Sequence, residues 1–200
     1  MKSKENLRIK FKLARNEIAN NLGKDCISIE NFLKLILILK KNNFELRNIG
    51  AYYPINSEIS PLKLIDICTQ HNINLCLPSI CSKSLKLNFR KWDGIENLVL
   101  SSFKTFEPSL KNQIMQPDII FVPLLAYDIE LNRLGYGGGF YDKTIYNLRN
   151  VNEQKNPFLA IGIGYDSQFI RSLPTEKHDQ KMDIVITEKK LIFKKGLFNK

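Results

Sequence analysis

The chain has 200 residues, of which 44% are hydrophobic, and a formal net charge of +10. That length fits a single domain over residues 1–200, and it is long enough to bury a full core without disulfide or metal staples. The four cysteines, Cys26, Cys68, Cys76 and Cys81, form no CxxC pair and stand in apolar segments, which favours core thiols in a reducing cytoplasm over a metal site or disulfides.

The positive charge is compatible with nucleic acid, an anionic membrane surface or anionic small substrates. No block of five or six like charges occurs, so a solvated basic surface is the simplest interpretation. The longest apolar run, residues 32–39, is interrupted by Lys34 and is far shorter than the ~20 residues of a membrane span. The charged N-terminus is unlike a signal peptide. We expect a cytoplasmic protein.

Apolar residues at helical spacing predict an amphipathic helix over residues 3–19. Lys4, Arg8, Lys12 and Arg15 share a neighbouring face, and such a row is ordinarily solvated. A second helix is predicted over residues 29–41. Its apolar residues nearly encircle it, so we expect it to be well buried.

A strand over residues 48–53, a helix from Ser60-Pro61 to residue 71 and a strand over residues 73–77 follow. Pro54 and Pro78 are expected to end the two strands. Residues 85–90 alternate and suggest an edge strand, and residues 92–116 suggest loops and short pieces. The strand–helix–strand order predicts an α/β fold with an open, mainly parallel sheet flanked by helices, a Rossmann-like three-layer arrangement. Ligands are expected at the carboxyl ends of its strands.

The centre of the chain reads as strand, glycine loop and helix. Residues 118–122 predict a strand stopped by Pro123, and residues 139–147 predict a helix. Further strands are predicted over residues 158–163, 184–186 and 191–193.

Between the central strand and helix lies the run Arg133-Leu134-Gly135-Tyr136-Gly137-Gly138-Gly139. The glycines permit positive φ and close approach of a ligand to the backbone. Backbone N–H groups that lead into a helix N-terminus make an anion site. Arg133 is a candidate phosphate partner, and Asp142 is a candidate Mg²⁺ ligand. The run matches neither a Walker P-loop nor GxGxxG, so a purely structural turn remains the alternative.

The run RLGYGGGFYDK, after a strand that leads into VPLLAYD, resembles the signature of the 5-formyltetrahydrofolate cyclo-ligases, also called methenyltetrahydrofolate synthetases. Weaker pieces in the same order extend the resemblance over nearly the whole chain: Lys4-x-x-Leu7-Arg8, Tyr53-Pro54 with Glu58-Ile59, Glu107-Pro108, Leu173-Pro174, His178-Asp179, Met182-Asp183-Ile184-Val185 and Thr187-Glu188. Some family members carry basic residues where this chain has Tyr136 and Gly138, so more of the phosphate binding would come here from backbone N–H groups and Arg133.

The resemblance implies an enzyme that uses ATP, with Mg²⁺, to convert 5-formyltetrahydrofolate to 5,10-methenyltetrahydrofolate, releasing ADP and phosphate. It implies catalytic roles for Arg133 and Tyr141 and metal ligation by Asp142 and Asp183. The implied ATP-binding residues are Lys4, Glu5, Asn6, Leu7, Arg8, Arg133, Leu134, Gly135, Tyr136, Gly137, Gly138, Gly139, Phe140 and Tyr141. The implied folate-binding residues are Tyr53, Glu58, Tyr136, Gly137, Gly138, Gly139 and Phe140.

Several alternatives remain open. Glu58 would accept two parallel pterin N–H groups, or it would only favour the start of the helix that follows. Asp183 would otherwise cap or turn the chain before a strand. For the whole chain, the alternatives are a non-catalytic nucleotide- or sugar-phosphate-binding protein and a nucleic-acid-binding protein, although no RNP, KH or helix-turn-helix pattern supports the latter. The expected partners are the two small substrates, without nucleic acid or membrane, and the expected state is a monomer.

Overall fold

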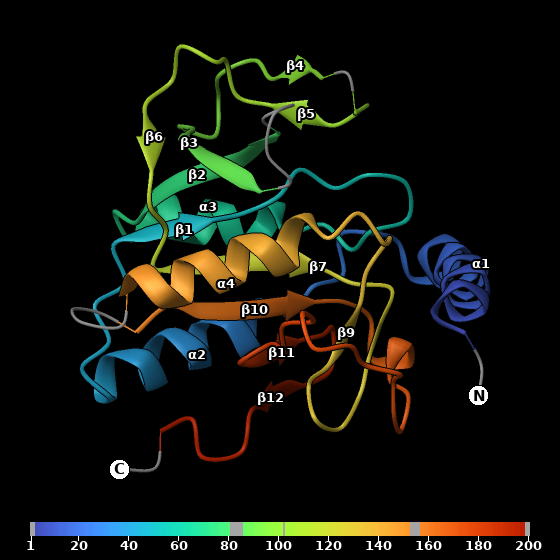
Figure 1. The fold of residues 1–200 in the computed structure, drawn as a ribbon. Coiled ribbons are helices and arrows are strands. Elements are labelled where there is room, and N and C mark those ends of the chain that lie inside the picture. Colours follow the sequence, from blue (N-terminus) through green and yellow to red (C-terminus); the bar gives the residue numbers. More distant parts are fainter. Residues whose placement is uncertain (1–2, 81–85, 102, 153–156, 199–200) are drawn as a thin grey trace.

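The computed structural model describes residues 3–80, 86–101, 103–152 and 157–198. Its largest element is a mixed sheet in the order β12-β11-β10-β7-β1-β2-β3-β6 (Figure 1). The helices are α1 (Lys4–Leu22), α2 (Ile29–Lys41), α3 (Leu62–Gln70) and α4 (Phe140–Asn152), with a short 3-10 helix over Asp166–Gln168. The strands are β1 (Asn48–Gly50), β2 (Asn74–Ile80), β3 (Leu87–Lys91), β4 (Val99–Leu100), β5 (Phe106–Glu107), β6 (Ile114–Met115), β7 (Ile119–Pro123), β8 (Ala126–Tyr127), β9 (Arg133–Leu134), β10 (Leu159–Ile163), β11 (Ile184–Ile186) and β12 (Leu191–Phe193).

The five strands β11, β10, β7, β1 and β2 pair in parallel, and antiparallel strands lie outside them on both sides. The predicted α/β fold with a mainly parallel sheet is therefore confirmed. Side chains of β7 alternate between two cores, because successive residues of a strand point to opposite faces. Ile119 and Phe121 pack with residues of α2 and α3, whereas Ile120 and Val122 pack with Ile145 of α4. Helices therefore cover both faces, as a three-layer fold requires (Figure 1).

Helix α1 begins where Ser3 accepts a hydrogen bond from Asn6 N, as an N-cap does, and ends at Gly23 with φ of 76°. It lies off the end of the sheet toward which β7 and β10 point (Figure 1). Leu7 and Phe11 pack there against Leu134 of the β8–β9 hairpin and other residues after β7. A basic helix is thereby held at the edge where ligands are expected.

Of the three prolines expected to end strands, Pro123 is the last residue of its strand, Pro78 does not end its strand, and Pro54 follows a strand that already ends at Gly50. β2 continues through Pro78 to Ile80, because its pairing with β1 stops at Cys76 while its pairing with β3 goes on, with Pro78 opposite Phe89. β7 includes Pro123 at its last position, where no further ladder bond is needed. The predicted strand over residues 48–53 is shorter, ending at Gly50, and the central helix is longer, running to Asn152. Cys81 and Leu85 lie outside the described residues.

Two further expectations about helices need correction. Helix α3 begins at Leu62 with Pro61 as its N-cap, one residue later than the Ser60 cap predicts. Helix α2 is not buried all round, since Leu37 is 67% exposed and Leu33 is 39% exposed. The sheet covers only one side of α2, so apolar residues on its outer side stay in solvent. None of the helices described is long and apolar enough to cross a membrane.

Candidate active site

A cavity of about 350 Å³ lies at the carboxyl ends of β1, β2 and β7, between the start of α1, the glycine loop and the β4–β5 hairpin. It is lined by Lys4, Arg8, Tyr52, Tyr53, Ile55, Glu58, Pro78, Ile80, Leu87, Thr105, Phe106, Glu107, Pro123, Arg133, Leu134, Gly135, Tyr136, Gly137, Gly138, Gly139, Phe140, Tyr141, Asp142, Glu176, His178 and Asp179. This is the edge of the sheet at which ligands were expected.

The glycine loop forms one wall, between β9 and the first turn of α4. Gly137 has φ of 99° and Gly139 has φ of 69°, which confirms that the backbone uses conformations that side chains disfavour. Arg8 from α1 donates a hydrogen bond through Nε to Gly135 O at 3.0 Å. A Cβ on Gly137 would lie 3.1 Å from Arg8 Cζ. The loop is thus packed closely against the arginine, with the N-terminus of α4 behind it.

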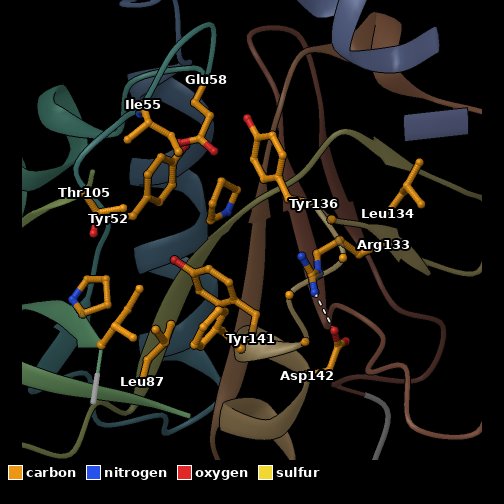
Figure 2. Close-up of a pocket in the computed structure, with 18 of the residues that line it drawn as sticks. Tyr52, Ile55, Glu58, Leu87, Thr105, Arg133, Leu134, Tyr136, Tyr141 and Asp142 are labelled. Atoms are coloured by element: carbon orange, nitrogen blue, oxygen red, sulfur yellow. Dashed lines mark hydrogen bonds and ion pairs between the residues drawn. The ribbon is translucent and has the colours of Figure 1, made fainter. Parts of the chain in front are cut away.

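Two of the cations at this wall are paired with carboxylates. Arg133 Nη2 lies 3.0 Å from Asp142 Oδ2 (Figure 2), and its Nε is buried with no hydrogen-bond partner in the described part of the chain. Lys4 Nζ lies 2.9 Å from Glu176 and 2.6 Å from Asp179. Burial lowers the pKa of Lys4, but hydrogen bonds and charge from the two carboxylates outweigh it, and the pKa is raised above 10.5. The wall therefore carries three cations, two of them held by carboxylates of the same wall, and a free donor.

Glu58 stands on the opposite wall, in the segment after β1, and its carboxylate points toward Tyr136 (Figure 2). Its Oε2 accepts a hydrogen bond from Ile55 N at 3.0 Å, and its Oε1 lies 3.9 Å from Arg15 Nη1. Only 3% of Glu58 is exposed. Burial raises the pKa of Glu58 to about 7, although the bond from Ile55 N, the charge of Arg15 and a hydrogen bond from Tyr136 oppose the rise. A carboxyl group that titrates near neutrality therefore faces the cavity.

Aromatic rings line the space between these walls. The Tyr53 and Phe106 rings meet edge to face with centroids 5.4 Å apart, which joins the segment after β1 to the β4–β5 hairpin. The Tyr141 ring lies within cation–π range of Arg133, at 5.7 Å from ring centroid to Cζ. Burial raises the pKa of the Tyr141 hydroxyl, with a smaller contribution from Glu58, so this group stays protonated. The cavity can thus enclose a flat ring system and donate a hydrogen bond to it.

Some of the predicted site residues lie elsewhere. Glu5 and Asn6 are exposed on α1, and Leu7 is buried in the core beneath that helix. Asp183 does not line the cavity: its carboxylate accepts hydrogen bonds from Arg149 Nη2 at 2.8 Å and from Ala160 N at 2.9 Å, just before β11 begins. The other predicted residues, which are Lys4, Arg8, Tyr53, Glu58, residues 133–141 and Asp142, all line it.

The fit of Mg²⁺ can be tested on these positions. Asp142 and Asp183 were expected to ligate it together, but only Asp142 is at the cavity. Among the residues that the structure describes, no group of three or more His, Cys, Asp or Glu side chains could hold a metal ion. Mg²⁺ commonly needs only one or two carboxylates plus phosphate oxygens. Asp142 therefore fits such a site when a nucleotide supplies the remaining ligands, whereas Asp183 does not fit.

Sequence reasoning missed Arg15 and several lining residues. Arg15 was grouped with a solvated row of basic residues, yet it is 1% exposed, while Lys12 of the same row is exposed. The β4–β5 hairpin contributes three lining residues, Thr105, Phe106 and Glu107. The sequence of this region shows no clear periodicity, so the hairpin was not predicted. Glu107 holds the hairpin to the end of β2, because its Oε2 accepts a hydrogen bond from Ile80 N at 3.2 Å. The pair Glu107-Pro108, which belongs to the family resemblance, was the available signal for this region.

Comparison with known proteins gives a consistent result. A sequence model of the 5-formyltetrahydrofolate cyclo-ligase family matches residues 1–188. The 5-formyltetrahydrofolate cyclo-ligase of Haemophilus influenzae is 35% identical to this chain, and the match covers 70% of this chain and 75% of that protein. The enzyme of the same name from Mycoplasma genitalium is 29% identical, with 93% of this chain and 98% of that protein covered.

The fold is also similar to a solved one. The solution structure of 5,10-methenyltetrahydrofolate synthetase from Aquifex aeolicus superposes with a TM-score of 0.68 at 24% identity, covering 96% of this chain and 93% of that chain. At this identity the likeness concerns the fold.

Proposed function

The chain belongs to the 5-formyltetrahydrofolate cyclo-ligase family and has the activity of that family, and we propose that the cavity beside the glycine loop is its active site. The reaction uses ATP to cyclise 5-formyltetrahydrofolate, and the products are 5,10-methenyltetrahydrofolate, ADP and phosphate. The observation that carries the proposal is the juxtaposition, in one cavity, of an anion-binding wall and a carboxylate with aromatic neighbours.

The chemistry needs few side chains, because the substrate supplies its own nucleophile. The formyl oxygen attacks the γ-phosphorus of ATP, and ADP leaves. N10 then forms a bond to the formyl carbon and gives up its proton, the bond from that carbon to the phosphorylated oxygen breaks, and phosphate departs with the proton, which leaves the methenyl bridge. Phosphoryl transfer of this kind depends on positioning and on neutralising charge. The protein must therefore hold two anionic substrates in contact and keep cations at the phosphates.

The wall formed by the glycine loop, Arg8, Arg133 and Lys4, here called the phosphate wall, is suited to binding the triphosphate of ATP. Arg8, Arg133 and Lys4 present positive charge, and the glycines let phosphate oxygens reach the backbone N–H groups before α4. The unpartnered Arg133 Nε is a buried donor that a phosphate oxygen would satisfy. A triphosphate would also replace Asp142, Glu176 and Asp179 as the anionic partners of Arg133 and Lys4. In this proposal Arg133 acts catalytically by stabilising charge on the transferring phosphoryl group.

The wall opposite is suited to the pterin ring. A ring N–H beside an exocyclic NH₂ presents two parallel donors, which an ionised Glu58 can accept together. Tyr53 and Phe106 supply an apolar surface for the flat ring. The protonated hydroxyl of Tyr141 can donate to charge that develops on the reacting oxygen, which supports its catalytic role.

We include Mg²⁺ in this proposal with Asp142 as its single protein ligand. Bound there with ATP, the ion would neutralise part of the triphosphate charge. Asp142 would then exchange its ion pair with Arg133 for the metal, and this would free Arg133 for the phosphates. A monomeric, cytoplasmic enzyme without nucleic-acid partners stays a prediction of the sequence.

One assay tests the function. The absorbance of methenyltetrahydrofolate should rise when the protein, 5-formyltetrahydrofolate and Mg-ATP are mixed, and it should not rise without ATP. An Arg133→Ala protein serves as the control for contaminating activity, because it removes the arginine placed at the phosphates. Nucleotide binding without any product would instead favour the non-catalytic alternative.

A further inference from the structure

Arg15 is a fully buried arginine in the middle of α1, two helical turns after Arg8. Its Nε donates to Ser57 Oγ at 3.1 Å and its Nη1 donates to Leu124 O at 3.4 Å. Its Nη2 donates to the Tyr136 hydroxyl, and the Tyr136 ring lies 5.4 Å from its Cζ. These partners come from the segment after β1, the residue that follows β7 and the glycine loop. One guanidinium therefore fastens three separate parts of the chain.

Two of those parts belong to opposite walls of the cavity. Tyr136 lies within the glycine loop, on one wall. Ser57 precedes Glu58 on the other wall, and Glu58 Oε1 is 3.9 Å from Arg15 Nη1. Figure 2 shows the Glu58 carboxylate and Tyr136 close together and pointing toward each other, so the two walls approach one another at this point. A movement of the loop that shifts Tyr136 must therefore also shift the guanidinium that faces Glu58.

The charges around Glu58 favour its ionised form when Arg15 is close to it. The titratable or charged groups that act on Glu58 in the described structure are Arg15, Tyr136, Tyr52 and Tyr141. The three tyrosines are neutral, since burial raises the pKa of each above its ordinary value, and Arg15 carries a positive charge. In the described structure its guanidinium donates to a hydroxyl, a carbonyl and a phenol, none of which carries charge. The ionised form of Glu58 is therefore the natural counter-charge for Arg15.

We propose, on the basis of the function proposed above, that Arg15 is a positioning residue that couples the two substrate sites through Tyr136. When ATP phosphates order the glycine loop, the Tyr136 hydroxyl holds the guanidinium against Glu58, and the charged carboxylate is then ready for the pterin donors. Coupling of this kind is reciprocal, so bound folate also strengthens the binding of ATP.

The test measures the dissociation constant of 5-formyltetrahydrofolate with and without a saturating non-hydrolysable ATP analogue and Mg²⁺. In the parent, the analogue should tighten folate binding by about 5-fold or more, the lower end of ordinary allosteric coupling. Tyr136→Phe removes only the hydroxyl from a side chain that is 45% exposed, so the fold should survive. In that variant the tightening should fall to about twofold or less. The control is Tyr146→Phe, a matched deletion on α4 at a tyrosine that is 57% exposed and outside the cavity, and it should keep the full coupling.

Arg15→Lys adds a second measurement, because it keeps the charge but removes the planar fork that reaches three acceptors. It should reduce the coupling as Tyr136→Phe does. Independent binding of the two ligands in the parent overturns the proposal, and so does full coupling in Tyr136→Phe. Both results are distinct from failure of the proposed function, since a parent that forms the methenyl product while binding its ligands independently remains a cyclo-ligase. A parent that forms no product overturns the function itself.

Discussion

Replacing Glu58 by Gln should change the pH dependence of folate binding as well as its strength. The carboxyl group is buried, and its pKa is raised from 4.5 to about 7, mainly because burial disfavours the charged form. If the pterin needs both oxygens as acceptors, only the ionised enzyme binds it well. The apparent affinity should then follow the ionised fraction, which falls about tenfold between pH 8 and pH 6 for a group with that pKa.

The variant loses this behaviour because an amide does not titrate. It presents one acceptor and one unwanted donor to two N–H groups, which should cost about 2–3 kcal/mol, or roughly 30- to 150-fold in affinity, above the pKa. The deficit should shrink about tenfold at pH 6, where most of the parent is protonated. Isothermal titration of 5-formyltetrahydrofolate from pH 5.5 to pH 8.5, in the absence of ATP, measures both effects.

Stability supplies an independent check on the same carboxyl group. Below pH 4.5 it is protonated in the folded and unfolded chains, and it costs nothing. As the pH rises, the unfolded chain ionises first, so the folded protein loses up to about 3 kcal/mol, and the loss is complete just above the folded pKa. The ligand-free Gln variant should therefore gain stability relative to the parent between pH 5 and pH 8 in urea unfolding. Folate affinity within about twofold of the parent at every pH would refute the pterin role and leave Glu58 as a residue of the turn before α3.

Three further predictions concern the phosphate wall. Arg8→Ala should raise the KM for ATP by roughly 10- to 150-fold, the value of one charged hydrogen bond, whereas Lys12→Ala on the exposed side of α1 should not; steady-state kinetics with equal effects in both variants would contradict this. Gly137→Ala should weaken ATP binding and destabilise the fold by about 1–2 kcal/mol, because Gly137 has φ of 99° and the new Cβ would lie 3.1 Å from Arg8; normal ATP titration and normal melting would argue against a phosphate loop. Asp142→Asn should lower kcat more than it changes the KM for folate and should increase the Mg²⁺ concentration needed for half activity, and unchanged Mg²⁺ dependence would exclude Asp142 as the metal ligand.

Much of the fold could be predicted from local pattern. Helix α2 and the strands β11 and β12 have the predicted bounds, because apolar periodicity and short β-branched runs mark them directly. The glycine loop could also be recognised from local sequence, since a run of glycines by itself indicates a backbone with positive φ, which Gly137 and Gly139 adopt. Pro78 was misjudged, because whether a proline ends a strand depends on which neighbouring strand needs its N–H.

The site depended on residues that periodicity treats alike. Lys4, Arg8, Lys12 and Arg15 follow the same helical spacing, yet Lys4 and Arg8 line the cavity, Lys12 is exposed and Arg15 is buried. The partners of Arg15 lie 42, 109 and 121 residues further along the chain, at distances in sequence that no local pattern spans. The sequence alone therefore determined which basic residues could pair with a phosphate and which stretch of backbone a phosphate could approach closely. Only tertiary structure decided which charges lose their water, and loss of water is what brings the pKa of Glu58 to about 7 and makes Arg15 depend on its partners.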